Sequence, residues 1–264
     1  MLKRWTMFAL CSLFLSAAFP AAATDYTDIW YIPAESGWGV NLVQAEDVMF
    51  ATFFVYGANN QPTWFVAITS QDANGNFAGS LYTTVGPYYG GPWNPAIYMP
   101  TLAGTASFVP TSPYAGTLTY SIINGPTVVR SIQRQTLKTI SLGGNYTGGQ
   151  SGGYTQCNDS SQNGAYTDTY PGPTGLAVTH ANGAATFVFT YASGSTCTMA
   201  GNLTQVGQLY QISSMQYSCT GNLSFNVNGT MDEIKATAQG IEGHFTATLG
   251  SGCQENAAFS AVLN

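Results

Sequence analysis

The sequence predicts an all-β protein made of two small antiparallel β-barrels or strongly curled sheets in tandem. Three observations lead to this prediction. Alternating or apolar runs of strand length recur along the chain, turn signals such as GANNQP and DANGN separate them, and no amphipathic helical segment occurs. Regularly spaced strands without helices are typical of antiparallel sandwiches and barrels. We interpret each half of the chain as an up-and-down barrel.

The first residues predict export. Lys3 and Arg4 precede an apolar run from Trp5 to Ala18, and small residues follow up to Ala23. This pattern predicts a secretory signal peptide over residues 1–23, cleaved after Ala23. The run is shorter than the roughly 20 apolar residues that a membrane-spanning helix needs. We therefore expect an exported protein, secreted or periplasmic, with no transmembrane segment after cleavage.

The composition excludes one class of partner. Charged residues make up 7% of the chain, against about 25% in an ordinary soluble domain. After cleavage, four basic residues remain against all 12 acidic ones, which gives a net charge of −8. Phosphate backbones need clustered Lys and Arg, so we expect no nucleic-acid partner. An apolar fraction of 45% is sufficient for a folded core.

The predicted strands follow in order. Residues 24–140 form an N-terminal β domain with strands at 37–44, 48–56, 62–70, 77–85, 105–110, 115–122 and 127–135. The glycine-rich segment GGNYTGGQSGG, residues 143–153, is predicted as a flexible linker. Residues 141–264 form a C-terminal β domain with strands at 175–181, 185–192, 197–206, 209–219, 233–240, 242–250 and 256–264. In the second of these, Phe187, Phe189 and Tyr191 alternate with smaller residues and predict the inner face.

The mature cysteines all lie in the second half. Four cysteines in an exported chain favour two disulfides, with three pairings formally possible. Cys197 and Cys219 flank two alternating runs around Gly207, which predicts cross-strand neighbours in a hairpin and leaves Cys157 with Cys253. The chain has no CxxC spacing, and its two histidines are isolated in the sequence. We therefore expect neither a metal site nor a cofactor.

Aromatic residues in the first half are the candidate binding residues. In GWGVNLVQ, Trp38 shares a face with Val40 and Leu42, which favours a tryptophan plug at one end of the barrel and leaves ligand stacking as the alternative. The strand at 48–56 is apolar on both faces, so we expect its outer face to be covered, by the second domain rather than by a ligand. The loop VGPYYGGPWNP presents rigid aromatics that are equally suited to stacking on sugars or apolar groups and to capping the mouth of the barrel. The predicted ligand-binding residues are Trp38, Tyr56, Trp64, Tyr88, Tyr89 and Trp93.

Two patterns suggest other chemistry. GQSGG formally matches a GxSxG hydrolase elbow at Ser151, with His180 or His244 as base and an Asp as the third member, but no helix follows and a glycine-rich linker explains it better. DANGN resembles the opening of a calcium loop, yet Thr83 stands where the closing Glu belongs, so we expect a hairpin turn. Alternating strands also occur in outer-membrane barrels, but the cysteines and the polar residues on both faces of the second half count against that class.

The run DIWYIPAESGWGVNLVQAEDVMFATFFVYGANNQPTWFVA, followed by GSLYTTVGPYYGGPWNP, resembles a recurrent domain of exported proteobacterial proteins with the pattern W-x-x-P-x-E-S-G-W-G. The second half is similar to a cysteine-containing companion module of such proteins. Tyr31 and Ile32 depart from the family's usual Trp and Asn. The resemblance implies a secreted β-rich protein, and the family has no established activity or catalytic residues to transfer.

Together these observations predict a secreted, non-enzymatic binding protein. It would recognise a small apolar or sugar ligand, or a protein surface, through its aromatic residues. An extracellular or envelope structural or adhesion protein is the alternative, and a secreted hydrolase is the second alternative.

Overall fold

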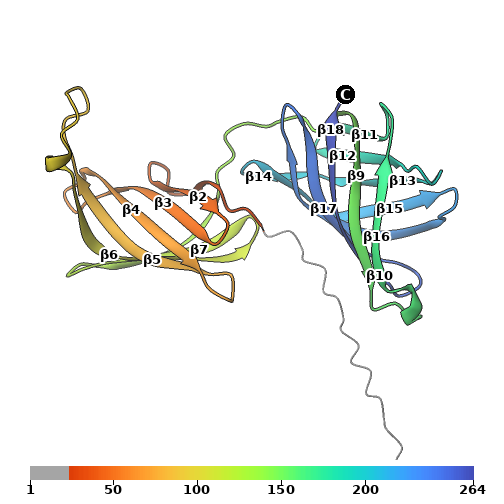
Figure 1. The fold of residues 1–264 in the computed structure, drawn as a ribbon, viewed down its shortest axis with the longest axis horizontal. Coiled ribbons are helices and arrows are strands. Elements are labelled where there is room, and N and C mark those ends of the chain that lie inside the picture. The colour runs from red at the N-terminus through yellow and green to blue at the C-terminus, as the bar shows by residue number, and fades with distance from the viewer. Residues whose placement is uncertain (1–23) are drawn as a thin grey trace, which may run out of the picture.

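The computed structural model describes residues 24–264 and confirms the predicted all-β class, with two closed antiparallel barrels in tandem (Figure 1). The predicted signal peptide lies outside the described residues. Within residues 24–264, no helix is long and apolar enough to cross a membrane.

Barrel 1 is an up-and-down barrel in which each strand pairs with its neighbour in the sequence. It closes where β8 pairs with β1, with Trp30 opposite Arg134. Its elements are β1 (Asp28–Tyr31), β2 (Gly39–Ala45), β3 (Val48–Tyr56), β4 (Pro62–Gln71), β5 (Phe77–Val85), the 3-10 turn η1 (Pro95–Ile97), β6 (Met99–Ser112), β7 (Ala115–Ile122) and β8 (Thr127–Arg134).

Barrel 2 closes through its first strand. One edge of β9 pairs with β18, and the other edge pairs first with β11 and then with β10, which together fill one strand position. Its elements are β9 (Gly144–Thr155), η2 (Ser160–Gln162), β10 (Gly164–Tyr170), β11 (Leu176–Ala181), β12 (Ala184–Thr190), β13 (Thr196–Asn202), β14 (Thr204–Val206), β15 (Leu209–Thr220), β16 (Phe225–Ala236), β17 (Gly240–Thr248) and β18 (Gln254–Leu263).

Each barrel has its own core, filled by alternate residues of its strands. In barrel 1, Val40, Leu42 and Phe53 are fully buried, and Trp30 packs edge-on against Phe108 with ring centroids 5.0 Å apart. In barrel 2 the core is equally apolar at its centre and includes the predicted inner face; its largest buried side chains are Phe187, Phe189, Phe245 and Tyr170. Alternation therefore predicted the inner faces in both halves.

The glycine-rich segment 143–153 is not a linker, and that prediction is wrong. It forms most of β9, because its glycines allow the neighbouring strand to approach closely. A Cβ on Gly148 would lie 2.2 Å from the carbonyl oxygen of Ser260, and one on Gly152 would lie 2.5 Å from the Cβ of Ala257. The connection between the barrels is instead formed by residues 135–143.

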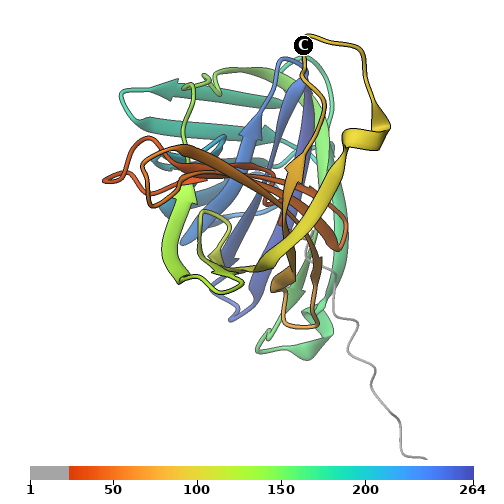
Figure 2. The ribbon, with the colours of Figure 1, turned by 90° about the vertical axis from the view of Figure 1, so that its left-hand side faces the viewer.

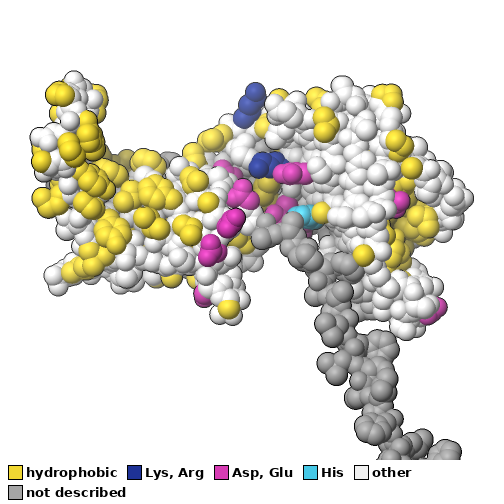
Figure 3. Space-filling model, in the orientation of Figure 1, with side chains coloured by type: hydrophobic (Ala, Val, Ile, Leu, Met, Phe, Trp, Pro, Cys, Tyr) yellow, Lys and Arg dark blue, Asp and Glu magenta, His cyan; other side chains and the backbone are white. Residues whose placement is uncertain are grey.

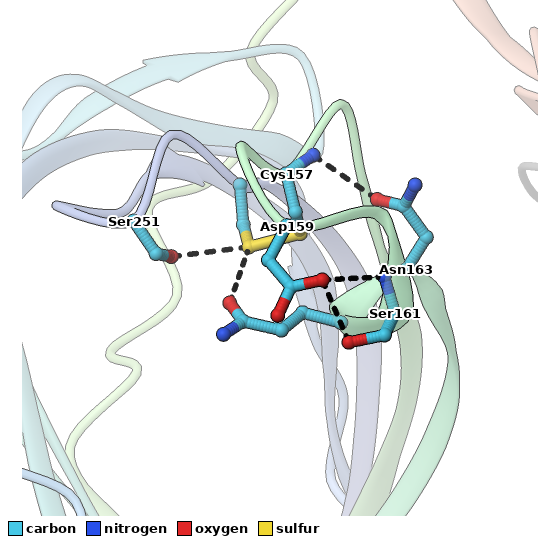
Figure 4. Close-up of a disulfide and its surroundings, with 7 residues drawn as sticks. Cys157, Asp159, Ser161, Asn163 and Ser251 are labelled. Carbon is cyan, nitrogen blue, oxygen red and sulfur yellow. Dashed lines mark hydrogen bonds between the residues drawn. A yellow bond between two sulfur atoms is a disulfide. The ribbon is translucent and has the colours of Figure 1, made fainter.

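Both disulfides pair as the sequence predicts. Cys197 and Cys219 are register partners on β13 and β15 and form one bridge. Cys157 and Cys253 form the other, which closes the chain across 96 residues. Figure 4 shows its surroundings, where the Cys157 N–H donates to Asn163 Oδ1 at 3.0 Å.

The barrels meet end to end, and a buried ion pair lies at the junction. Arg134 Nη1 lies 3.3 Å from Asp28 Oδ2, and both side chains are almost fully buried. The Gln208 N–H of barrel 2 approaches the same carboxylate at 3.4 Å. Gly207 in the β14–β15 turn has φ +68°, and a Cβ there would lie 2.5 Å from both Arg134 and Asp28. The turn fits against the ion pair only because this residue is glycine.

Candidate functional site

The topology of barrel 1 gathers the predicted binding residues at one end. Neighbouring strands are antiparallel, so the start of β2, the end of β3, the start of β4 and the loop from β5 to β6 lie together. The junction with barrel 2 lies at the opposite end, where β1 begins and β8 ends. We call this outer end of barrel 1 the aromatic end. It holds all six predicted binding residues, Trp38, Tyr56, Trp64, Tyr88, Tyr89 and Trp93.

Five of these six side chains are exposed. Tyr89 is 95% exposed, Trp93 is 69% exposed and Trp64 is 50% exposed. Tyr56 and Tyr88 are exposed as well. Figure 3 shows hydrophobic side chains gathered over this part of the molecule, in contrast to barrel 2. Exposed apolar patches of this kind mark interaction surfaces in proteins that are otherwise polar.

Trp38 differs from the other five. It is partly buried and packs against the core of barrel 1, and its indole N–H donates to Glu35 Oε2 at 3.0 Å. The same carboxylate oxygen lies 3.7 Å from Arg130 Nε. Trp38 is therefore packed partly onto the core of barrel 1, which agrees with a structural role, and its ring is less available for stacking than those of the other five residues.

The loop between β5 and β6 projects beyond the strands, as Figure 2 shows. Its shape is set by local hydrogen bonds, since the Gly91 N–H donates to the Tyr88 carbonyl oxygen at 3.0 Å and Asn94 Oδ1 accepts from the Ala96 N–H at 3.1 Å. The Tyr88 and Tyr89 rings lie 4.9 Å apart. These turns hold the backbone of the loop in one shape while the aromatic rings face solvent. Less conformational entropy is then lost when a ligand binds to the rings.

The expectation that the second domain covers the outer face of β3 is wrong. Phe50 and Phe54 on that face are 43% and 57% exposed, because barrel 2 contacts the end of barrel 1 and not its wall. Phe54 stands opposite Trp64 in the register of β3 and β4 and extends the aromatic end. The doubly apolar pattern of this strand was the sequence signal for Phe54. Exposed residues further along the chain were missed because their runs look like ordinary strands or turns: Tyr98, Met99, Leu102, Ile123 and Val129.

A cleft of about 720 Å³ lies at the junction, on the outer surface of barrel 2. Its lining includes Ser151, Glu233, Lys235 and His244 together with Arg134 of barrel 1. Figure 3 shows acidic and basic side chains and a histidine gathered between the barrels. Burial raises the pKa of Glu233 above its ordinary value. Charged and polar side chains are thus part of the lining of this cleft, whereas the aromatic end exposes mainly aromatic side chains.

The residues of the hydrolase pattern lie apart on the sheet. Ser151 sits within β9 and not on the strand-to-helix turn that a nucleophile elbow requires. Ser151 and His244 both pair with Ala258 from opposite sides, so two strand spacings, about 10 Å, separate their backbones. The other histidine, His180, accepts a hydrogen bond from the Leu142 N–H at 3.3 Å on a different part of barrel 2.

Inside barrel 2, a buried carboxylate lies among tyrosines. Glu255 is 2% exposed, and the hydroxyl of Tyr166 donates to its Oε1 at 2.5 Å. Its Oε2 has no hydrogen-bond partner among the described residues. Burial raises the pKa of Glu255, although hydrogen bonds from the surrounding tyrosine hydroxyls partly oppose the shift. The Glu255 carboxylate lies in the interior of barrel 2 and is not part of the aromatic end of barrel 1.

No family model matches this chain, and no curated protein or solved structure matches it either. The resemblance to exported proteobacterial proteins accordingly stays a prediction that rests on the motif residues alone.

Proposed function

We propose that this protein is an exported binding protein whose aromatic end recognises an extended apolar or carbohydrate surface. The observation that supports this most strongly is the set of exposed aromatic side chains on the end of barrel 1 that faces away from barrel 2. An aromatic patch that neither the fold nor the neighbouring domain covers costs solvation free energy unless a partner covers it.

The chemistry of the patch defines the class of ligand. Tyr and Trp combine a broad apolar face with a polar edge, so they stack on sugar rings and on apolar groups. The nearest opposite charges, Glu35 and Arg130, are paired with each other and offer no net charge to an ionic ligand. The patch is spread over strand ends and a projecting loop, so a flat or extended ligand fits it better than a small enclosed one.

The aromatic end can be removed without touching the core. Trp93→Ala combined with Tyr89→Ala deletes two side chains that are 69% and 95% exposed, so the double variant is expected to fold as the parent does. We expect the parent to be retained on an insoluble polysaccharide or on alkyl-agarose, and the double variant to elute with the void volume. A Leu223→Ala, Val262→Ala variant removes exposed apolar side chains from barrel 2 and serves as the matched control.

If the parent and the double variant are retained equally, the aromatic end is not the binding surface. If the double variant is unfolded, these residues have a structural role instead. Native mass spectrometry of the protein isolated from its own host gives an independent measurement. A discrete extra mass that is lost on unfolding identifies a bound ligand, whereas a defined homo-oligomer would instead support the structural or adhesion function.

A further inference from the structure

Three metal-binding side chains converge on barrel 2 beside the junction cleft. Asp232 and Glu233 lie on β16, and His244 lies opposite them on β17. His244 Nδ1 is 3.9 Å from Asp232 Oδ1 and 3.8 Å from Glu233 Oε1, and the three ligand atoms all lie within 4.8 Å of one another. No spacing pattern predicts this group, because a turn separates His244 from the two acids in the sequence.

A break in the strand register places the two acids together. Successive residues of a regular strand point to opposite faces, so adjacent carboxylates normally diverge. Here the β16–β17 pairing shifts between Asp232 and Lys235, and Glu233 has φ +47°, in the left-handed region. The irregularity turns Glu233 to the same side as Asp232, whose register partner is His244. Both carboxylates therefore face one imidazole.

The separations are those of ligands that share an ion. A histidine hydrogen-bonded to a carboxylate would lie about 2.7 to 2.9 Å from it, and the observed distances are almost 1 Å longer. Bonds of about 2.1 Å at a tetrahedral angle hold two ligand atoms about 3.4 Å apart. The two distances from His244 exceed that spacing by about 0.4 to 0.5 Å, and the two carboxylate oxygens, which lie within 4.8 Å of each other, would approach by up to about 1.4 Å when an ion binds.

Among residues 24–264, the carboxylates of this group have no direct ion pair with a lysine or arginine, and Arg134 acts on Glu233 only from a longer distance. Within the described residues, no lysine or arginine nitrogen lies within 4.0 Å of either carboxylate, and the guanidinium of Arg134 is already bound to Asp28. Thr24 Oγ1 donates to Glu233 Oε1 at 2.8 Å and leaves the other lone pairs of the carboxylate free. Gln208 Nε2, which lines the same cleft, is buried with no hydrogen-bond partner among the described residues.

We propose that Asp232, Glu233 and His244 bind one divalent transition-metal ion of the Zn²⁺ class, with an open coordination position toward the junction cleft. One imidazole nitrogen and two carboxylate oxygens form a ligand set that Zn²⁺ accepts. Ca²⁺ and Mg²⁺ prefer oxygen ligands throughout, so the imidazole selects against them. The cysteines take no part, because all four described ones are in disulfides.

The test is a Zn²⁺ titration by isothermal calorimetry on protein prepared without a histidine tag. The parent is expected to bind one Zn²⁺ per chain and no Ca²⁺, and Co²⁺ in its place should give visible d–d absorption bands. His244→Ala should weaken Zn²⁺ binding at least about tenfold, or about 1.4 kcal/mol. Glu233→Gln removes one ligand charge with little change of shape and should weaken binding in the same direction.

His180→Gln, which alters the other histidine, is the matched control and should bind Zn²⁺ as the parent does. The double variant of the aromatic end should also bind normally, because the metal site lies on barrel 2 and the aromatic end lies on the end of barrel 1 away from the junction, so the two sites can fail independently. Absence of saturable Zn²⁺ binding in the parent overturns the proposal. Unchanged binding in folded His244→Ala and Glu233→Gln variants overturns it as well.

Discussion

The two barrels share an architecture and distribute their apolar residues in opposite ways. Barrel 1 has no cysteine and leaves large aromatic side chains on its surface, whereas barrel 2 has two disulfides and a polar exterior. Of the large hydrophobic side chains that are exposed, only three belong to strands or turns of barrel 2: Leu223, Val262 and Leu263. The same strand pattern therefore supports two different surfaces.

The two barrels also differ in how they are stabilised. Barrel 2 places a carboxylate and several tyrosine hydroxyls in its interior and has disulfides at pairs of neighbouring strands, β9 with β18 and β13 with β15. Barrel 1 has an apolar core apart from Thr69 and the ion pair at the junction, and edge-to-face aromatic pairs such as Phe53 and Tyr120 pack there with ring centroids 5.4 Å apart. Such a core can be combined with an apolar exterior, because most residues of the aromatic end are exposed and contribute little to the packing of the core.

The disulfide between Cys157 and Cys253 gives the largest expected effect. Replacing both residues with Ser removes a link across 96 residues, which the loop-entropy estimate values at about 4 to 5 kcal/mol. Only barrel 2 should lose stability. The described tryptophans, Trp30, Trp38, Trp64 and Trp93, all lie in barrel 1, so tryptophan fluorescence follows that barrel alone, while near-ultraviolet circular dichroism of tyrosine also follows barrel 2.

In urea, the tyrosine signal of the double Ser variant should change at a lower concentration than in the parent, while the tryptophan midpoint stays in place. The Cys197→Ser, Cys219→Ser variant is the matched control, because its link spans 22 residues and its loss should cost less. If the tryptophan and tyrosine midpoints fall together, the barrels unfold as one unit and the separation described above is wrong.

The buried ion pair at the junction gives the next largest effect, this time on barrel 1. Arg134→Met leaves the buried Asp28 carboxylate without its charged partner, and the backbone carbonyl oxygens that Arg134 binds lose their donor. Breaking a buried pair from one side costs about 3 kcal/mol or more. The tryptophan midpoint in urea should fall.

The exposed pair Arg130 and Glu35 provides the comparison. Arg130→Met removes a similar side chain from an ion pair that is about half exposed at both partners, where the loss is about 0 to 1 kcal/mol. Equal destabilisation by the two substitutions would show that burial at the junction adds nothing to the ion pair.

Much of this architecture follows from the sequence. Alternation identified the strands that have a regular apolar face, and the symmetric placement of Cys197 and Cys219 around Gly207 predicted their pairing. Alternation failed where glycine replaces side chains, so β9 was taken for a linker, and it missed β1, which has only four residues. Alternation along a strand also does not distinguish an outer apolar face that meets water from one that another domain covers. For this reason the prediction that the second domain covers the outer face of β3 was wrong.

The two candidate sites also differ in how far the sequence predicts them. The residues of the aromatic end are contiguous in motifs that show their character directly, and up-and-down topology then places them together. The group of Asp232, Glu233 and His244 depends on a register shift within β16, which no residue pattern in that strand predicts. Sequence reasoning finds what local chemistry determines and misses what an irregular backbone assembles.

The smallest expected effect concerns the carboxylate inside barrel 2 and is a dependence on pH. Burial raises the pKa of Glu255 in the folded protein above its ordinary value of 4.5. The folded state therefore holds this proton more tightly than the unfolded state, and the contribution of Glu255 to stability is present below pH 4.5 and is lost as the pH rises through the folded-state pKa.

Glu255→Gln cannot ionise and lacks this loss, so its stability relative to the parent should increase with pH from about 4 upward. Urea unfolding at a series of pH values, followed by the tyrosine signal, measures the difference. A difference between parent and Glu255→Gln that stays constant across this range would mean that the carboxylate stays charged in the fold, stabilised by the hydroxyls of the tyrosines around it. The polar interior of barrel 2 would then stabilise the charge it encloses, and the contrast with the apolar core of barrel 1 would be one of chemistry and not of energetic cost.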